Sequence, residues 1–188
     1  MVLGALAALL ERAEGIRVVA QARNGREALE AVAAHEPDVL IADIEMPQMN
    51  GLELADRLKD HPTVKVIVLT TFARPGYLRR AIDAGAYGYL LKDRPARELA
   101  DAVRKVFQGE RVIDSDLAAE ALSDPDPLTD REREVLRLAS EGVSGKEIAT
   151  RLGLSRGTVR NYLSEAMNKL GGANRVDAAR IARSKGWL

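Results

Sequence analysis

Residues 39–51 decide the fold of the first half of the chain, and they read Val39-Leu-Ile-Ala-Asp43-Ile-Glu-Met-Pro-Gln-Met-Asn-Gly51. The run starts with four apolar residues, a pattern typical of a short strand buried on both faces of a parallel sheet. Asp43 follows these four residues, at the carboxyl end of the predicted strand. The carboxyl ends of such strands are where open α/β sheets bind their ligands. The carboxylate can act as a nucleophile and form an acyl phosphate, although a single aspartate here is more often a helix cap or a turn residue.

Strand-like and helical patterns alternate on both sides of this stretch. Short β-rich runs predict strands at 16–20, 39–42, 64–69 and 87–91. Helical spacing of apolar residues predicts helices at 25–35, 51–59, 75–84 and 95–108. This alternation predicts an α/β domain, a flavodoxin-like doubly wound parallel sheet with helices on both faces.

Two further polar residues follow the next two predicted strands. Thr70 comes directly after 64–69, and Lys92 comes directly after 87–91. Because the carboxyl ends of parallel strands share one edge of the sheet, Asp43, Thr70 and Lys92 are expected to converge there. A nucleophile, a hydroxyl donor and a cation are what a transferred phosphoryl group needs, so the three together favour phosphoryl chemistry over a purely structural aspartate.

The spacing of these residues resembles the receiver domain of response regulators. The resemblance covers Asp43, Met46-Pro47, Gly51, Thr70 and Gly88-Tyr89-Leu-Leu-Lys92, and the following Asp93 is typical of the NarL/FixJ family. It implies that Asp43 accepts a phosphoryl group from a sensor histidine kinase and that Thr70 and Lys92 bind the phosphoryl oxygens. It implies that Tyr89 moves between outward and inward positions. It also implies a Mg²⁺ cofactor, held by the Asp43 carboxylate and the backbone carbonyl of Glu45.

The amino end of the chain departs from that family pattern. The pattern begins with a central strand that ends in two adjacent Mg²⁺-binding acidic residues, whereas residues 1–10 match the helix that follows that strand. Roughly eleven residues are therefore missing, and Mg²⁺ would keep too few ligands for its octahedral geometry. The missing strand would leave unpaired backbone groups and a gap in the core. Either Met1 is an internal methionine of a longer working protein, or the receiver is degenerate and regulates without phosphate. We expect the first, because the predicted phosphoryl-binding residues are intact.

The second half of the chain changes to a purely helical pattern. The breaker Asp124-Pro-Asp-Pro127 separates the halves, so we assign residues 1–112 to an N-terminally incomplete receiver, 113–126 to a linker and 127–188 to an all-α four-helix domain. The helix starts in this domain are predicted from capping residues, namely Thr129 with Glu132, Ser144 with Glu147, Ser155, and Asn174 after Gly171-Gly172.

The middle two helices of this domain have the proportions of a helix-turn-helix. A short helix at 146–152 and a turn at Gly153 precede a longer helix at 155–170, whose inward face is apolar at three- and four-residue spacing. The opposite face carries residues able to contact base edges in the major groove: Arg156, Arg160, Asn161 and Ser164. Thr158 and Lys169 are placed to contact phosphates. The alternative is an ordinary helical hairpin with a solvated basic face.

This domain resembles the LuxR-type DNA-binding domain over its whole length. The resemblance covers 128–136, Glu147-Ile-Ala149, Leu152, Ser155, Thr158-Val159 and Lys169-Leu170. It implies that 146–152 is the scaffold helix, that 155–170 is the recognition helix for duplex DNA, and that the last helix, 174–184, pairs two such domains. Val176, Ala179 and Ala182 would suit that interface, although they could equally be core. Residues 69–77 and 157–162 narrow the resemblance to desaturase regulators of membrane-thermosensing systems, and several envelope-stress regulators look similar.

Composition and charge agree with a cytoplasmic regulator that binds DNA. The 188-residue chain has no cysteine, which excludes disulfides and thiolate metal sites. Residues 127–188 hold 12 Lys and Arg against 7 Asp and Glu, whereas residues 1–126 hold 16 against 21, so the net charge is +5 after the boundary and −5 before it. The apolar stretch 2–10 is too short to span a bilayer, and we expect no membrane partner.

We therefore expect a transcription factor and not an enzyme. Phosphorylation of Asp43 is expected to promote homodimerisation and binding of promoter DNA at an inverted or direct repeat. An enzyme acting on small molecules would need a second general acid or base near Asp43, and His35 and His61 look like helix-end residues instead. A pure interaction module would leave the basic recognition face unexplained.

Overall fold

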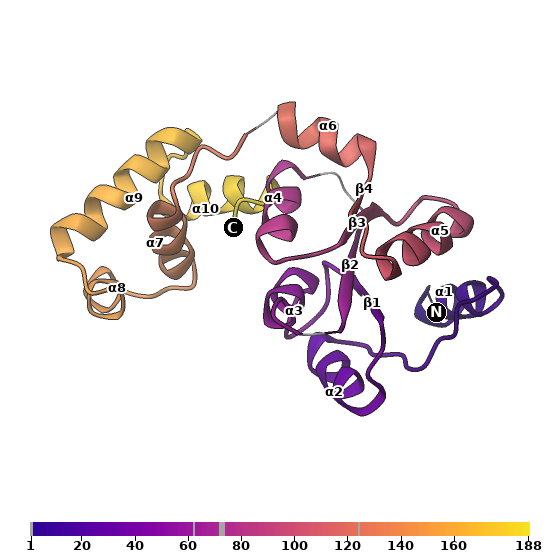
Figure 1. Ribbon diagram of the computed structural model, residues 1–188. Coiled ribbons are helices and arrows are strands. Elements are labelled where there is room, and N and C mark those ends of the chain that lie inside the picture. The colour runs from indigo at the N-terminus through magenta and orange to yellow at the C-terminus, as the bar shows by residue number, and fades with distance from the viewer. Residues whose placement is uncertain (1, 62, 72–73, 124) are drawn as a thin grey trace. The chain divides into compact units, whose positions relative to one another are not determined.

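The computed structural model describes residues 2–61, 63–71, 74–123 and 125–188 (Figure 1). Met1, Phe72, Ala73 and Asp124, on which parts of the sequence predictions fall, lie outside the described residues. The chain forms two compact units, and the changeover along the chain lies between residues 120 and 121. Within the described residues, no helix has the length and apolar character needed to cross a membrane.

A four-stranded sheet lies at the centre of the first unit. Its strands are β1 (Val39–Asp43), β2 (Lys65–Thr70), β3 (Gly88–Leu91) and β4 (Val112–Ile113), and they follow one another across the sheet in that order. All three pairings are parallel, as predicted. The register joins Val39 to Lys65, Ile67 to Gly88 and Gly88 to Val112. β1 therefore occupies one edge of the sheet.

Helices cover both faces of this sheet, which confirms the predicted doubly wound fold (Figure 1). One face carries α1 (Val2–Glu11) and α5 (Ala96–Phe107). The other face carries α2 (Gly25–His35), α3 (Gly51–Arg57) and α4 (Pro75–Asp83). β2 is buried on both faces: Ile67 and Leu69 pack with α5, while the alternate residues Val66 and Val68 are equally buried.

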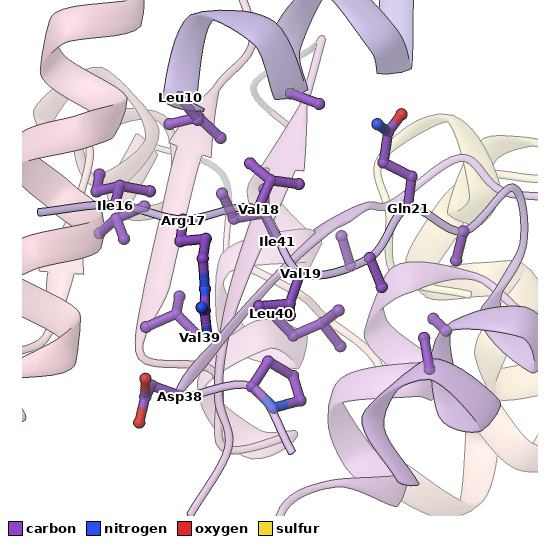
Figure 2. A pocket seen from close by; sticks show the side chains of 18 of the residues that line it. Leu10, Ile16, Arg17, Val18, Val19, Gln21, Asp38, Val39, Leu40 and Ile41 are labelled. Carbon is purple, nitrogen blue, oxygen red and sulfur yellow. The ribbon is translucent and has the colours of Figure 1, made fainter. Parts of the chain in front are cut away.

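The predicted strand at 16–20 is wrong. Residues 16–22 form no ladder with any described strand, and Val18 instead donates its N–H to a carboxylate oxygen of Glu11 at 2.7 Å. The physical reason is that a strand exists only with a neighbour to share its hydrogen bonds. Among the described residues no strand lies beside this segment, so it has nothing to pair with. Figure 2 shows the pocket that this segment lines together with β1.

The predicted linker at 113–126 contains a helix, α6 (Ser115–Ser123), which starts directly after β4. Arg94 anchors its start by donating to both carboxylate oxygens of Asp114, at 2.7 and 2.8 Å, and to Asp116 as well. The hydrogen bonds from Arg94 hold the pKa of the buried Asp114 carboxyl below its usual value, against the opposing effect of burial. The receiver sequence pattern carries no local signal for this contact.

The second unit contains the predicted helical domain, with helices α7 (Asp130–Ser140), α8 (Gly145–Leu152), α9 (Arg156–Leu170) and α10 (Arg175–Ser184). α9 joins two apolar clusters, because Val159 packs with Val135 and Ile148 while Ala166 packs with Leu136. The second of these clusters also takes in Trp187, in agreement with the expectation that it packs the carboxyl end.

Candidate phosphorylation site and DNA interface

The three predicted phosphoryl-site residues lie at one edge of the sheet. Asp43 ends β1, Thr70 ends β2, and Lys92 follows β3 directly. The register sets Asp43 beside Leu69 and Thr70 beside Leu91, and the Lys92 N–H donates to the Thr70 carbonyl oxygen at 2.8 Å. Parallel pairing therefore collects residues separated by up to 49 positions in the chain.

Asp43 is held by a cation and by a backbone donor. The Lys92 ammonium bonds one carboxylate oxygen, and the Glu45 N–H donates to the other at 3.0 Å. The side chains of Lys92 and Asp43 are 28% and 32% exposed, so the pair is open to a molecule arriving from solvent. A carboxylate with one neighbouring cation, reachable from solvent, can attack a phosphorus atom and have the new negative charge neutralised in place.

Close packing near this edge determines the position of Tyr89 and the need for a glycine at position 51. Tyr89 is 2% exposed, which is the inward one of its two predicted positions. At Gly51, a Cβ atom would lie 2.3 Å from the carbonyl oxygen of Asp43, so the first turn of α3 can approach the end of β1 only without a side chain. Asn50 closes that turn as a capping box with Glu53.

The helix-turn-helix is built from three local signals, and all three were predicted. Ser144 caps α8 through the Glu147 N–H at 3.2 Å, although the reciprocal half of a capping box is not formed there. Gly153 ends α8 with φ of 65°, in the left-handed region that favours glycine. Ser155 then caps α9 through the Thr158 N–H at 3.0 Å. The turn is therefore fixed by two serine caps and one left-handed glycine.

The predicted base-reading residues Arg156, Arg160, Asn161 and Ser164 are all exposed on α9. Arg156 and Arg160 line a shallow hollow of about 480 Å³ between the start of α8 and α9. Lys146 lines the same hollow from α8. Within the described part of the chain none of these three cations forms an ion pair, so their charge is available to an anionic ligand.

Lys169 and Thr158, the two residues predicted to contact phosphates, are already bonded to other side chains of the domain. Lys169 donates to both carboxylate oxygens of the buried Glu132, at 2.9 and 2.7 Å. The Thr158 hydroxyl is bonded to the Ser155 hydroxyl at 2.8 Å. Both side chains thus already have a partner inside the domain, and a phosphate would have to share it.

Comparisons with known proteins match each half of the chain to a family. Residues 1–104 match the response regulator receiver domain, and residues 126–182 match the luxR family of bacterial regulatory proteins. The transcriptional regulatory protein YvfU of Bacillus subtilis is 53% identical over 189 residues, covering 100% of this chain and 94% of YvfU. DesR of the same organism is 49% identical over 188 residues, with the same coverage.

The chain is a LuxR-type response regulator. A solved structure of the response regulator RcsB in complex with DNA aligns with 97% of the chain and 93% of that protein, at 28% identity and a TM-score of 0.66. The regulator thus belongs among transcription factors and not among enzymes, as expected. The resemblance of the sequence to NarL/FixJ-family response regulators with a LuxR-type DNA-binding domain is confirmed.

The donors that the regulator offers to Mg²⁺ do not suit that ion. Asp43 supplies one carboxylate, already bonded to Lys92, and Glu45 could add a backbone carbonyl. Across the described ranges no three acidic or histidine side chains come together in a group able to hold a metal. Mg²⁺ needs near-octahedral oxygen coordination, so this donor set is incomplete.

The structure places two of the three apolar residues of the last helix in the core. Ala179 and Ala182 are fully buried in the core of the regulator's second unit, whereas Val176 is 68% exposed. Only Val176 of these three is available to a partner. Lys146 is the residue that sequence reasoning missed, because it stands outside the recognition helix and its nearness to Arg160 arises from the turn.

Proposed function

We propose that Asp43 is the phosphoacceptor of this regulator and that a sensor histidine kinase is the donor. In the reaction, the bond between the phosphorus and the kinase histidine nitrogen breaks as an Asp43 oxygen forms a new bond to phosphorus. The observation that supports this assignment is the Lys92 ammonium on the Asp43 carboxylate, at the sheet edge where Thr70 also ends its strand. Lys92 and Thr70 would bind the phosphoryl oxygens, and Tyr89 would respond to the change at Thr70.

Phosphorylation would act on the whole protein through dimerisation. It adds about −1.5 to −2 charges and three acceptor oxygens at one edge of the sheet. We propose that this biases the surface of α4 and α5, or of α1, toward a second copy. Two DNA-binding units would then engage half-sites about one helical turn, ~34 Å, apart, in an inverted or direct repeat.

For DNA itself, α9 is the proposed reading element. Arg156, Arg160, Asn161 and Ser164 would contact base edges, because these exposed side chains share one helix face. Lys146 would add a phosphate contact to those proposed for Thr158 and Lys169. We expect the regulator in the cytoplasm, where DNA and the kinase domain that carries the phosphohistidine would both be reached.

The phosphoacceptor is tested by intact-mass measurement after incubation with acetyl phosphate, a small phosphoryl donor. Wild-type protein is expected to gain one phosphoryl group and Asp43→Ala none. Asp56→Ala, which removes an exposed carboxylate on α3, is the matched control and should behave as wild type. Uptake by Asp43→Ala would assign the site elsewhere. No uptake by the wild type, with its DNA affinity unchanged, would support a degenerate receiver that works without phosphate.

The DNA interface is tested with duplexes selected from a random pool by the wild-type protein. Arg160→Ala is expected to weaken binding to the selected duplex by about 1–3 kcal/mol and to relax the choice of base at one position. Arg131→Ala removes an equal charge from α7, where the guanidinium is paired with Glu134, and should bind within about twofold of wild type. Fluorescence anisotropy at fixed salt gives the affinities. Equal losses in both variants would mean that only net charge matters.

A further inference from the structure

The helical unit pairs nearly every acidic side chain with a cation. Residues 127–188 hold seven Asp and Glu, and all seven lie in the described part of the chain. Six of them form ion pairs within the unit: Asp130, Glu132, Glu134, Glu141, Glu147 and Asp177. The seventh is Glu165 of α9, for which residues 125–188 supply neither an ion pair nor a side-chain hydrogen bond. Its exposed carboxylate is therefore uncompensated.

The local partner of Glu165 is held elsewhere. Lys169 lies four residues further along α9, and a Glu followed by a Lys at this spacing forms a favourable pair on helix surfaces. The Lys169 ammonium instead donates to both carboxylate oxygens of Glu132 in α7, at 2.9 and 2.7 Å. The other residues three and four positions away carry no charge: Asn161, Tyr162 and Asn168. The fold thus leaves the charge of Glu165 to a partner outside the domain or to water.

Nothing in the geometry of α9 requires an acid at position 165. Acidic residues stabilise the first turn of a helix, whereas Glu165 lies in the second half of Arg156–Leu170. The two ends of the helix are capped by Ser155 and Gly171. On a helix that meets the phosphates of a duplex, a carboxylate without a cation repels the DNA backbone. Glu165 therefore opposes DNA binding in general, unless a base donates a hydrogen bond to it.

Glu165 lies beside a residue that is proposed to read bases. Asn161 precedes it by four positions, and side chains at that spacing are neighbours on one face of a helix. Both residues are exposed. The hollow toward α8 is lined by Arg156 and Arg160, and Glu165 lies outside it. The negative charge is thus placed with the uncharged base-reading side chain and apart from the cations of the hollow.

We propose that Glu165 reads cytosine in the major groove. This inference rests on the proposed role of α9 in reading bases. Along the major groove cytosine presents a hydrogen-bond donor, its N4 amino group, and an ionised carboxylate can only accept. A cytosine at this position therefore supplies the donor that the domain itself does not supply to Glu165.

The same carboxylate disfavours the other bases at that position. Guanine presents two acceptors, N7 and O6, and thymine presents the O4 acceptor and a methyl group, so neither has a donor for Glu165. Adenine has an N6 amino group beside the N7 acceptor, which makes it the least disfavoured substitute. Glu165 weakens binding to DNA in general and restores it where cytosine is present, so it widens the ratio of specific to non-specific affinity.

The test compares Glu165→Gln and Glu165→Ala with the wild type on duplexes selected from a random pool. Glutamine keeps the length of the side chain without its charge, and it pairs well with adenine. We expect the wild type to select cytosine at one position of each half-site, Glu165→Gln to shift this position toward adenine, and Glu165→Ala to accept any base there. Replacing this cytosine by guanine should weaken wild-type binding about tenfold, but that of Glu165→Ala less than about twofold.

The matched control is Glu141→Gln, which removes an equal charge from an exposed acid directly after α7, where it is paired with Arg137. This variant should select the wild-type sequence. The proposal would be overturned if both Glu165 variants selected the wild-type sequence and bound every duplex more tightly by the same factor, because the carboxylate would then only repel phosphates. Helical circular dichroism should be unchanged in all variants, since the replaced side chains are exposed.

The Arg160→Ala variant separates failure of this inference from failure of the proposed function. A changed base in Arg160→Ala, with none in the two Glu165 variants, would leave α9 as the reading helix and remove only the role of Glu165. An unchanged sequence in all three variants would mean that α9 does not read bases, and both proposals would then be wrong.

Discussion

Glu132 shows how one residue can take part in capping, burial and charge pairing together. Its backbone N–H donates to the Thr129 hydroxyl oxygen, and its carboxylate accepts from the Thr129 N–H at 2.7 Å. Both carboxylate oxygens also accept from the Lys169 ammonium. Burial of the carboxyl works to raise its pKa, but the hydrogen bonds from Lys169 and Thr129 outweigh burial, and the net pKa is lowered. The Lys169 ammonium is therefore part of the fold before any phosphate reaches it.

The lowered pKa of Glu132 makes the stability of the helical unit depend on pH. A carboxyl whose pKa is lower in the folded than in the unfolded chain stabilises the fold above its unfolded value, and this contribution is lost as pH falls through the folded value. We expect Glu132→Gln to cost about 1–2 kcal/mol at pH 7 and much less at pH 3. Urea unfolding followed by Trp187 fluorescence measures both, since Trp187 packs in the same unit.

The control for this prediction is Glu147→Gln, because Glu147 forms an exposed ion pair with Arg151. Such pairs contribute little, so the variant should unfold like the wild type at either pH. A pH-independent loss in Glu132→Gln would show that packing and not charge holds this corner of the domain together.

At the residue scale, the sequence predicts side chains whose partners are set by regular spacing. Asp43 and Lys92 were expected together because parallel strands share an edge, and the structure bonds them. Arg94 and Asp114 are twenty residues apart and were not predicted to meet. Neither has a pattern of its own, and their contact depends on the path of the chain after β3 and into α6.

At the scale of elements, the junction of β1 and α3 leaves no room for a side chain at Gly51. The Cβ of any other residue at Gly51 would meet the Asp43 backbone, which cannot move without distorting β1. We expect Gly51→Ala to destabilise the first unit by about 1–3 kcal/mol, the usual cost of overpacking. Thermal unfolding followed by circular dichroism measures the loss. It should be accompanied by slower uptake of the phosphoryl group, because Asp43 is displaced.

Gly4 provides the comparison for Gly51. It lies within α1, and a Cβ there would meet nothing within 4 Å. Gly4→Ala should leave the unfolding temperature unchanged or raise it, because alanine is the better helix former by about 1 kcal/mol. If the two variants were destabilised alike, the close approach at Gly51 would carry no special cost.

Elements were predicted well where the signal is local and poorly where it is not. A helix start depends on one side chain that caps the backbone of the first turn. The caps predicted at Asn174, Ser155 and Thr129 all form. Residues 16–20 have the composition of a strand but no neighbouring strand to pair with, and the presence of a neighbour cannot be predicted from local composition. β4 has two residues, too few for any pattern, and it forms because β3 offers its free edge.

For the whole molecule, two features of the sequence were sufficient to predict the architecture. Strand-like and helical patterns alternate in the first half, which predicted the doubly wound sheet, and only helical patterns follow, which predicted the helical unit. The positive net charge of residues 127–188 predicted that this half binds a polyanion. The unpaired cations of the hollow between α8 and α9 lie in the same half. The domain limits 112 and 127 remain predictions. α6 lies between them as a helix, although the breaker at Pro125 and Pro127 indicated only an irregular connection.

The closed ends of α9 have a thermodynamic consequence. Both ends of the helix are capped without DNA, because Ser155 accepts from the Thr158 N–H at its start and the Gly171 N–H donates to carbonyls of the last turn at its end. Association with a duplex then involves no coupled folding of the reading element, and its heat capacity change should reflect only the apolar surface dehydrated at the contact. Calorimetry across a range of temperatures would show a small, constant slope of enthalpy, unlike that of a basic segment that orders as it binds.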